Sequence, residues 1–161
     1  MQRLIVDFRQ VSSNQIHLTA EQQHYLYRVL RLTVGDRFIA LDGQGRQWLG
    51  ELSQTPGLAI ATSLPTSASL APAITLAIAL PKGSGFDEVV RQTTELGVTT
   101  LQPVITERTL HHPNPKKLER WQRIAAEATE QSERLWMPTV LSPLPWLEYL
   151  AQPRPGQRWL C

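Results

Sequence analysis

The 161 residues are 42% hydrophobic and 19% charged, which is typical of a globular protein and excludes wholesale disorder. The formal net charge of +2 is too small to indicate a polyanionic partner by itself. The sequence contains neither an apolar segment of the ~20 residues that span a bilayer nor a signal-peptide core, so we expect a cytoplasmic protein without a membrane segment. A single cysteine, Cys161, excludes an intramolecular disulfide and a cysteine-based zinc site.

The first seventy residues predict a small β-barrel. Short runs separated by turn residues predict strands at 4–6, 16–18, 38–41, 48–52 and 58–62, with a hairpin turn at 42–45. Thr19 and Gln22 form a capping box that begins a helix through Arg31. Its apolar face is expected to hold Leu26, Val29 and Leu30. The proline- and serine-bearing segment 63–72 predicts a linker, so we expect a barrel domain over residues 1–70.

The second half predicts an α/β domain over residues 73–161. The almost continuously apolar segment 74–80 is typical of a strand covered on both faces. A helix capped by Ser84 should follow, with a buried face made of Phe86, Val89, Val90, Thr93 and Leu96. Gly97 ends this helix, and a second strand follows at 98–105. Strand, helix and strand in this order predict a βαβ unit and a parallel sheet.

Polar residues gather where the second strand ends. Glu107 and Arg108 follow that strand directly, and His111 and His112 lie in the next loop. Because open parallel sheets place their ligands beyond the carboxyl ends of the strands, this edge is the candidate site. Further elements are expected as a long helix at 115–135, a strand at 139–141, a short helix at 146–150 and a fourth strand at 158–161.

Each candidate residue also has a simpler interpretation. Glu107 and Arg108 form either a structural ion pair or part of a site. Glu127, Gln131 and Arg134, at i, i+4 and i+7, form either a surface ladder or a site wall, and Gln131 and Ser132 in or beside a buried stripe require hydrogen-bond partners. For His111 and His112 a solvated loop is favoured over a metal site, because adjacent side chains diverge and no carboxylate or thiol shares their spacing.

Several motifs along the chain together resemble those of one known family. In the first half they are residues 24–36 and the turn 42–45. In the second half they are 80–83, 92–98, 118–121 and 124–132, together with Pro103, Glu107, Arg108, Arg134 and Pro138. In order and spacing these motifs are similar to those of the RsmE group of 16S ribosomal RNA uridine-N3 methyltransferases. The agreement of many motifs over nearly the whole chain is more specific than any one of them.

This resemblance implies a PUA-like RNA-binding barrel followed by a SPOUT methyltransferase domain with a C-terminal trefoil knot. It also implies a homodimer that uses S-adenosylmethionine and acts on 16S ribosomal RNA or the small ribosomal subunit. The sequence ends before the family's Gly-Pro-Glu-Gly-Gly segment, which supplies most cofactor contacts. We therefore expect a fragment or truncated product, and little cofactor binding or activity from these residues alone.

The resemblance also implies catalytic and RNA-binding roles for the candidate residues. Arg108 would stabilise negative charge on the uracil ring, and Glu107 would act as general base. Lys82, Arg28 and Arg31 would contact the RNA backbone, although an exposed solubilising face also accounts for the two arginines. Glu127, Gln131, Ser132 and Arg134 would form a site wall or an interface. The alternative is a non-catalytic RNA-binding or ribosome-associated module; no metal is required.

Overall fold

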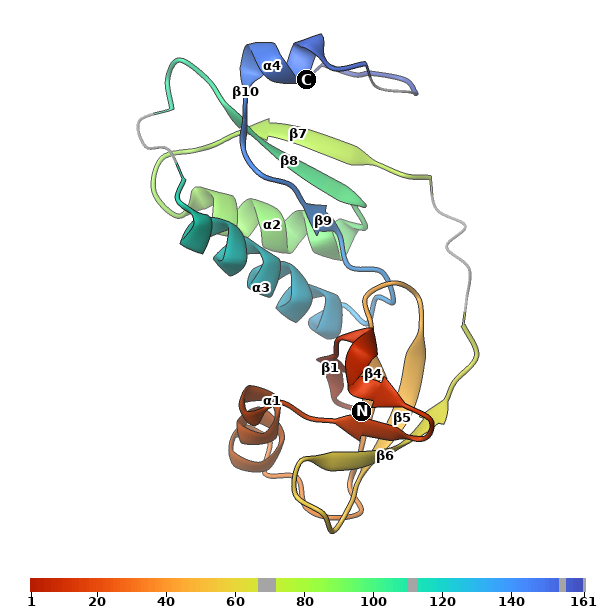
Figure 1. Ribbon diagram of the computed structural model, residues 1–161. Coiled ribbons are helices and arrows are strands. Elements are labelled where there is room, and N and C mark those ends of the chain that lie inside the picture. Colours follow the sequence, from red (N-terminus) through yellow and green to blue (C-terminus); the bar gives the residue numbers. More distant parts are fainter. Residues whose placement is uncertain (67–71, 110–112, 154–155, 161) are drawn as a thin grey trace.

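The computed structural model describes residues 1–66, 72–109, 113–153 and 156–160. Strands β1 to β6, within residues 3–63, form one sheet that we call the half-barrel. The elements from β7 to α4, within residues 75–151, form what we call the α/β unit. Figure 1 shows the α/β unit above the half-barrel, with α2 and α3 on one face of its sheet. The predicted segment 63–72 lies partly outside the described residues; its first residue, Ser63, still belongs to β6.

The half-barrel is a mixed sheet in the order β1-β4-β5-β6-β3-β2. Its strands are β1 (Arg3–Ile5), β2 (Val11–Ser12), β3 (Gln15–His17), β4 (Arg37–Leu41), β5 (Gln47–Leu52) and β6 (Leu58–Ser63). A short 3-10 helix, η1 (Phe8–Gln10), links β1 to β2. The fully buried core of the half-barrel includes Ile16, Leu26 and Phe38. The predicted strands are thus confirmed, and β1 and β2 are the two edges of the sheet.

The predicted first helix is confirmed at its start and wrong at its end. Thr19 and Gln22 form the expected capping box at α1 (Ala20–His24), which continues as a π-helical turn, η2 (Tyr25–Val29). Leu26 is buried as expected, but Val29 is 57% exposed. Arg31 lies beyond the helix with a φ of 57°, the left-handed region. Because the π-turn rotates the residues after Leu26, the predicted apolar face does not extend to Val29.

The α/β unit contains the predicted βαβ arrangement. β7 (Thr75–Ala79), α2 (Gly85–Leu96) and β8 (Thr100–Ile105) follow one another, and β7 and β8 are parallel. α3 (Pro115–Gln131) leads to β9 (Thr139–Val140) and β10 (Leu144–Pro145), which both run parallel to β8, and α4 (Trp146–Ala151) follows. Gly97 ends α2 with a φ of 90°, as predicted.

Several details of this unit differ from the predictions. Ser84 lies at the N-cap of α2, but its side chain makes no capping hydrogen bond. Leu96 is 79% exposed, although the pattern assigns it to the buried face, and Thr94, which the pattern does not assign to it, is fully buried. The apolar strand β7 is only partly buried, because within the described residues it lies at the edge of the sheet and pairs only with β8. The described residues 156–160 form no strand, while Cys161 lies outside the described residues.

Main-chain hydrogen bonds connect the half-barrel to the segment that follows α3. In the hairpin turn between β4 and β5, Gly45 N donates to Leu135 O over 3.0 Å, and Met137 N donates to Gly43 O over 2.9 Å. Gly45 has a φ of 95°, and a Cβ there would lie 2.5 Å from the indole of Trp136. Arg3 on β1 also pairs with Glu133 over 3.0 Å. Glycine is therefore required where this turn meets the indole.

Candidate functional site

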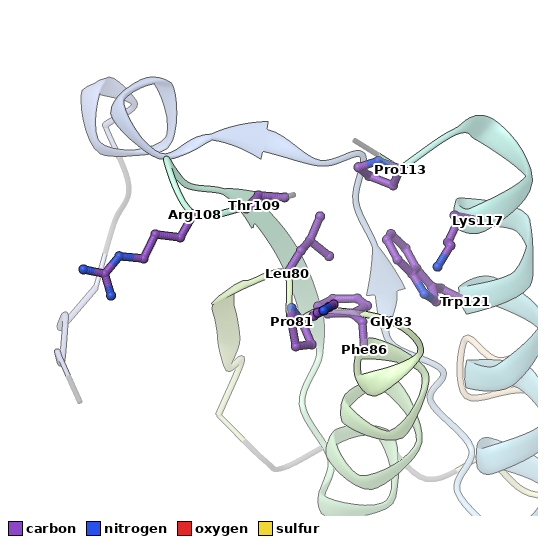
Figure 2. A pocket seen from close by; sticks show the side chains of 10 residues that line it. Leu80, Pro81, Gly83, Phe86, Arg108, Thr109, Pro113, Lys117 and Trp121 are labelled. Atoms are coloured by element: carbon purple, nitrogen blue, oxygen red, sulfur yellow. The ribbon is translucent and has the colours of Figure 1, made fainter. Parts of the chain in front are cut away.

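A pocket of about 300 Å³ lies at the carboxyl ends of β7 and β8, where sequence reasoning places the site. Figure 2 shows its lining side chains, which come from the end of β7, the turn after β8 and the first turns of α2 and α3. They are Leu80, Pro81, Lys82, Gly83, Phe86, Arg108, Thr109, Pro113, Lys117 and Trp121. The pocket thus combines an apolar wall with three cationic side chains.

The apolar wall is held by contacts between α2 and α3. Phe86 and Trp121 are each 2% exposed, and their ring centroids are 4.5 Å apart. Asp87 accepts hydrogen bonds from Trp121 Nε1 at 3.1 Å and from Arg120 Nε at 2.9 Å. Because the carboxylate satisfies the indole N–H and fixes the ring, the wall is ordered by the protein itself.

Arg108 and Glu107 occupy the turn after β8, and both are exposed. Thr109 Oγ1 accepts a hydrogen bond from Thr106 N at 3.0 Å, which tightens this turn. No ion pair joins the Glu107 carboxylate to the Arg108 guanidinium, although both residues lie within the described chain. Figure 2 shows the Arg108 side chain extending away from the aromatic wall. The guanidinium is therefore available to a ligand that approaches from solvent.

Lys82 and Lys117 approach the same pocket from different elements. Lys82 follows β7 in an exposed turn, as the sequence predicts. Lys117 was not predicted: it lies in the first turn of α3, where Asn114 Oδ1 accepts a hydrogen bond from Lys117 N at 3.1 Å. The Asn114-Pro115 pair was the available sequence signal for Lys117, because it marks the N-terminus of α3.

Glu127 and Gln131 lie elsewhere, in a groove of about 830 Å³ between the half-barrel and helices α2 and α3. Its walls include Ile5 of β1, Tyr25 and Val29 of η2, and Arg91 and Glu95 of α2. Gln131 ends α3, whereas Lys117 is in its first turn, so these two residues are ~20 Å apart along the helix. The structure therefore separates these two predicted residues from Arg108.

Glu130 is a groove residue that sequence reasoning missed. Its Oε1 accepts a hydrogen bond from Ile5 N at 2.6 Å, which joins α3 to β1. Burial raises the pKa of Glu130 from 4.5 to about 7; the hydrogen bond from Ile5 opposes the rise, and the negative charge of Glu127 adds to it. The same carboxyl groups, together with burial as the larger cause, raise the pKa of Tyr25.

Ser132 and Arg134 hold the end of α3 in place. Ser132 Oγ donates to Ala128 O at 2.6 Å, and Arg134 Nε donates to Glu95 O at 2.9 Å in the last turn of α2. A cation at a helix C-terminus is favourable to the helix dipole. These contacts satisfy both side chains within the α/β unit.

The remaining candidates lie on the surface or outside the described residues. Arg28 and Arg31 are both exposed and line neither the pocket nor the groove. His111 and His112 lie outside the described residues. Among the residues that the structure describes, no group of three or more His, Cys, Asp or Glu is placed to hold a metal ion. In the same part of the chain, none of the helices has the length and apolar character needed to cross a membrane.

Comparison with known proteins identifies both halves of the chain. Residues 69–161 match the model of an RNA methyltransferase domain, and residues 18–61 match that of an RNA methyltransferase PUA domain. The ribosomal RNA small subunit methyltransferase E of Synechocystis is 49% identical over 150 residues, which are 92% of this chain and 50% of the relative. The corresponding protein of Rickettsia conorii is 28% identical over 155 residues, 92% of this chain and 62% of the relative.

Solved structures show the same fold. The ribosomal RNA small subunit methyltransferase E of Neisseria gonorrhoeae, bound to S-adenosyl methionine, superimposes with a TM-score of 0.80 at 29% identity, over 95% of this chain and 66% of that one. A Legionella pneumophila protein matches in fold, with a TM-score of 0.82 at 22% identity, over 94% of this chain and 66% of that one. The chain spans about half the length of the Synechocystis relative. The match to the RNA methyltransferase domain covers more than half of this chain's residues, so the chain belongs to the RNA methyltransferase family.

Proposed function

We propose that this protein takes part in the S-adenosylmethionine-dependent methylation of a uridine at N3 in 16S ribosomal RNA of the small subunit. One observation carries the proposal: 92% of the chain aligns at 49% identity with a ribosomal RNA small subunit methyltransferase E. The solved relative at 29% identity was crystallised with S-adenosyl methionine, which supports that cofactor here. The cationic pocket at the strand ends supports an anionic substrate.

The described pocket does not fit the cofactor. S-adenosylmethionine carries a sulfonium and an ammonium group against one carboxylate, so it is a net cation at neutral pH. The pocket presents Lys82, Arg108 and Lys117, and no Asp or Glu is among its described lining residues. Like charges at this distance repel, so we assign the pocket to RNA and give its residues no contact with the cofactor.

The chain's own residues are proposed to act on the RNA. Methylation at N3 breaks the N3–H bond of uracil and leaves negative charge on the ring as the proton departs. The exposed Arg108 guanidinium stabilises that charge or grips the adjacent phosphate, and Glu107 beside it accepts the proton. Lys82 holds a backbone phosphate. The exposed Arg28 and Arg31 of the half-barrel contact the RNA further away.

The same proposal includes the organisation of the protein. We infer two domains, at residues 1–70 and 73–161, which separate sheets and separate apolar clusters support. We also infer a homodimer in the cytoplasm, the compartment in which ribosomal RNA is available to a bacterial-type methyltransferase. Light scattering of the purified protein would test the dimer, because a monomeric mass at working concentration contradicts it.

The test of function is single-turnover methylation of small-subunit ribosomal RNA by the full-length protein and its Arg108→Ala variant. A residue that stabilises transition-state charge contributes ~3–4 kcal/mol, so the rate should fall ~10²–10³-fold. The melting temperature should not change, because Arg108 is exposed and its guanidinium forms no ion pair with the Glu107 carboxylate. A variant that melts normally and methylates within about threefold of wild type would remove Arg108 from the reaction. Absence of any methylation by wild type would favour a non-catalytic RNA-binding module.

A further inference from the structure

We propose that the pocket at the ends of β7 and β8 binds one nucleotide of single-stranded RNA, with Lys117 on its phosphate and the accessible apolar residues Leu80, Pro81 and Pro113 against its base. This inference rests on the proposed function, because it names the part of the RNA that the pocket takes. It adds Lys117, which neither the sequence motifs nor the comparisons single out.

The charge around the pocket favours a phosphate. Lys82, Arg108 and Lys117 line the pocket from three separate segments of chain, with the Arg108 guanidinium extending toward solvent. The first turns of α2 and α3 contribute Phe86 and Lys117 to the lining, so the positive ends of two helix dipoles add to these side-chain charges. Asp87 in the first turn of α2 does not cancel them, since its carboxylate already receives the Arg120 and Trp121 hydrogen bonds.

The apolar side of the pocket favours a base beside that phosphate. Leu80, Pro81, Phe86, Pro113 and Trp121 line the same volume of about 300 Å³, which is far larger than a phosphate ion needs. Every nucleobase has an apolar face that packs against such a wall. In a duplex that face is stacked on its neighbours, so the nucleotide has to come from a single strand or an open loop.

Lys117 is distinguished from its neighbour Lys116 by position alone. Both are exposed lysines in the first turn of α3, but only Lys117 lines the pocket. The hydrogen bond from Lys117 N to Asn114 Oδ1 fixes its main chain, so the direction of its side chain is set by the helix start. Lys116 therefore provides a control of equal charge, exposure and helix position.

The experiment measures binding of a short uridine-rich single-stranded RNA to the 161-residue chain by fluorescence anisotropy over a range of salt concentrations. Lys117→Ala should weaken binding about 3–10-fold and reduce the slope of log K against log[salt] by ~0.7, the loss of one phosphate contact. Lys116→Ala should change affinity less than about twofold and leave the slope unchanged. Lys117→Arg should restore the slope. Equal effects of the two alanine variants, or no binding by wild type, would overturn the proposal.

A second arm separates the base from the phosphate. An oligonucleotide of the same length with abasic sugars keeps every phosphate, and it should bind roughly tenfold more weakly if a base packs on Leu80, Pro81 and Pro113. Equal affinity would overturn that part of the proposal.

Methylation assays of the full-length protein separate this inference from the proposed function. Lys117-dependent binding without any methylation would refute the function alone. Normal methylation with indistinguishable Lys116 and Lys117 variants would refute the inference alone.

Discussion

Glu130 should make the stability of this protein fall as pH rises through the neutral range. Its carboxyl group lies partly buried between α3 and β1, accepting a hydrogen bond from Ile5 N at 2.6 Å. Burial raises its pKa from 4.5 to about 7, and the charge of Glu127 adds to the rise. Among the half-barrel side chains, Tyr25 interacts electrostatically with Glu130, whereas the Arg3 guanidinium of β1 is paired with Glu133.

The sign follows from which state binds the proton more tightly. Because the folded pKa exceeds the unfolded value, the folded protein holds the proton more tightly, and this contribution to stability is complete below pH 4.5. It is lost progressively as pH rises from 4.5 to about 7. The full difference corresponds to ~3 kcal/mol, at ~1.4 kcal/mol per pKa unit. Since Glu130 is partly accessible to solvent, we expect ~1–2 kcal/mol.

The test compares Glu130→Gln with wild type by urea denaturation at several pH values. Glutamine keeps an oxygen that accepts the Ile5 hydrogen bond but does not ionise. Below pH 4.5 the two proteins should differ by no more than ~0.5 kcal/mol, and above pH 7 the variant should be more stable by ~1–2 kcal/mol. Glu119→Gln, on an exposed position of the same helix, is the control and should show no such trend. A stability difference that does not change with pH would refute the reasoning.

Three further outcomes are expected. Gly45→Ala should lower the free energy of unfolding in urea by at least ~2 kcal/mol, because it places a Cβ 2.5 Å from Trp136 on a left-handed backbone. Gly35→Ala has open space around its Cβ and should lower it by only the ~1 kcal/mol of backbone strain. Equal costs would show that the indole contact is irrelevant. Asp87→Ala should lower stability by ~2 kcal/mol, because it leaves the buried Trp121 N–H without an acceptor; an unchanged melting temperature would contradict this. Calorimetric titration of the 161-residue chain with S-adenosylmethionine should show weak or no binding, and low-micromolar affinity would contradict the conclusion that the described pocket does not fit this cofactor.

Local sequence predicted most elements of this fold because strands and helices carry their own periodicity. The capping box at Thr19 and the left-handed Gly97 are determined by neighbouring residues, and both are confirmed. Errors appear where tertiary context decides. Leu96 continues the apolar pattern of α2 but has no layer to cover it. The apolar composition of β7 likewise does not reveal that the strand lies at a sheet edge.

The candidate site was located by a rule about topology, and the rule has limits. Strands that end at the same sheet edge bring Lys82 and Arg108 to one pocket, so their proximity was predictable. The roles of Lys117 and Glu130 were not. Lys117 depends on where α3 begins relative to the strands, and the pKa of Glu130 depends on β1, which lies 125 residues away in sequence. The Asn114-Pro115 start shows where α3 begins, but no local pattern encodes how Lys117 or Glu130 is placed against the strands.

The docking of the β4–β5 turn on residues 135–137 also constrains how the protein is made. All strands of the half-barrel leave the ribosome before residue 135 is synthesised, so the half-barrel can fold while the N–H of Gly45 and the carbonyl of Gly43 still bind water. At ~5–20 residues per second, the nascent chain spends roughly 4–14 s in this state before its partner segment emerges. During that interval the glycine turn is an open docking surface on a growing polypeptide. A nascent chain halted near residue 130 would therefore expose it to chaperones and to other copies of the same half-barrel.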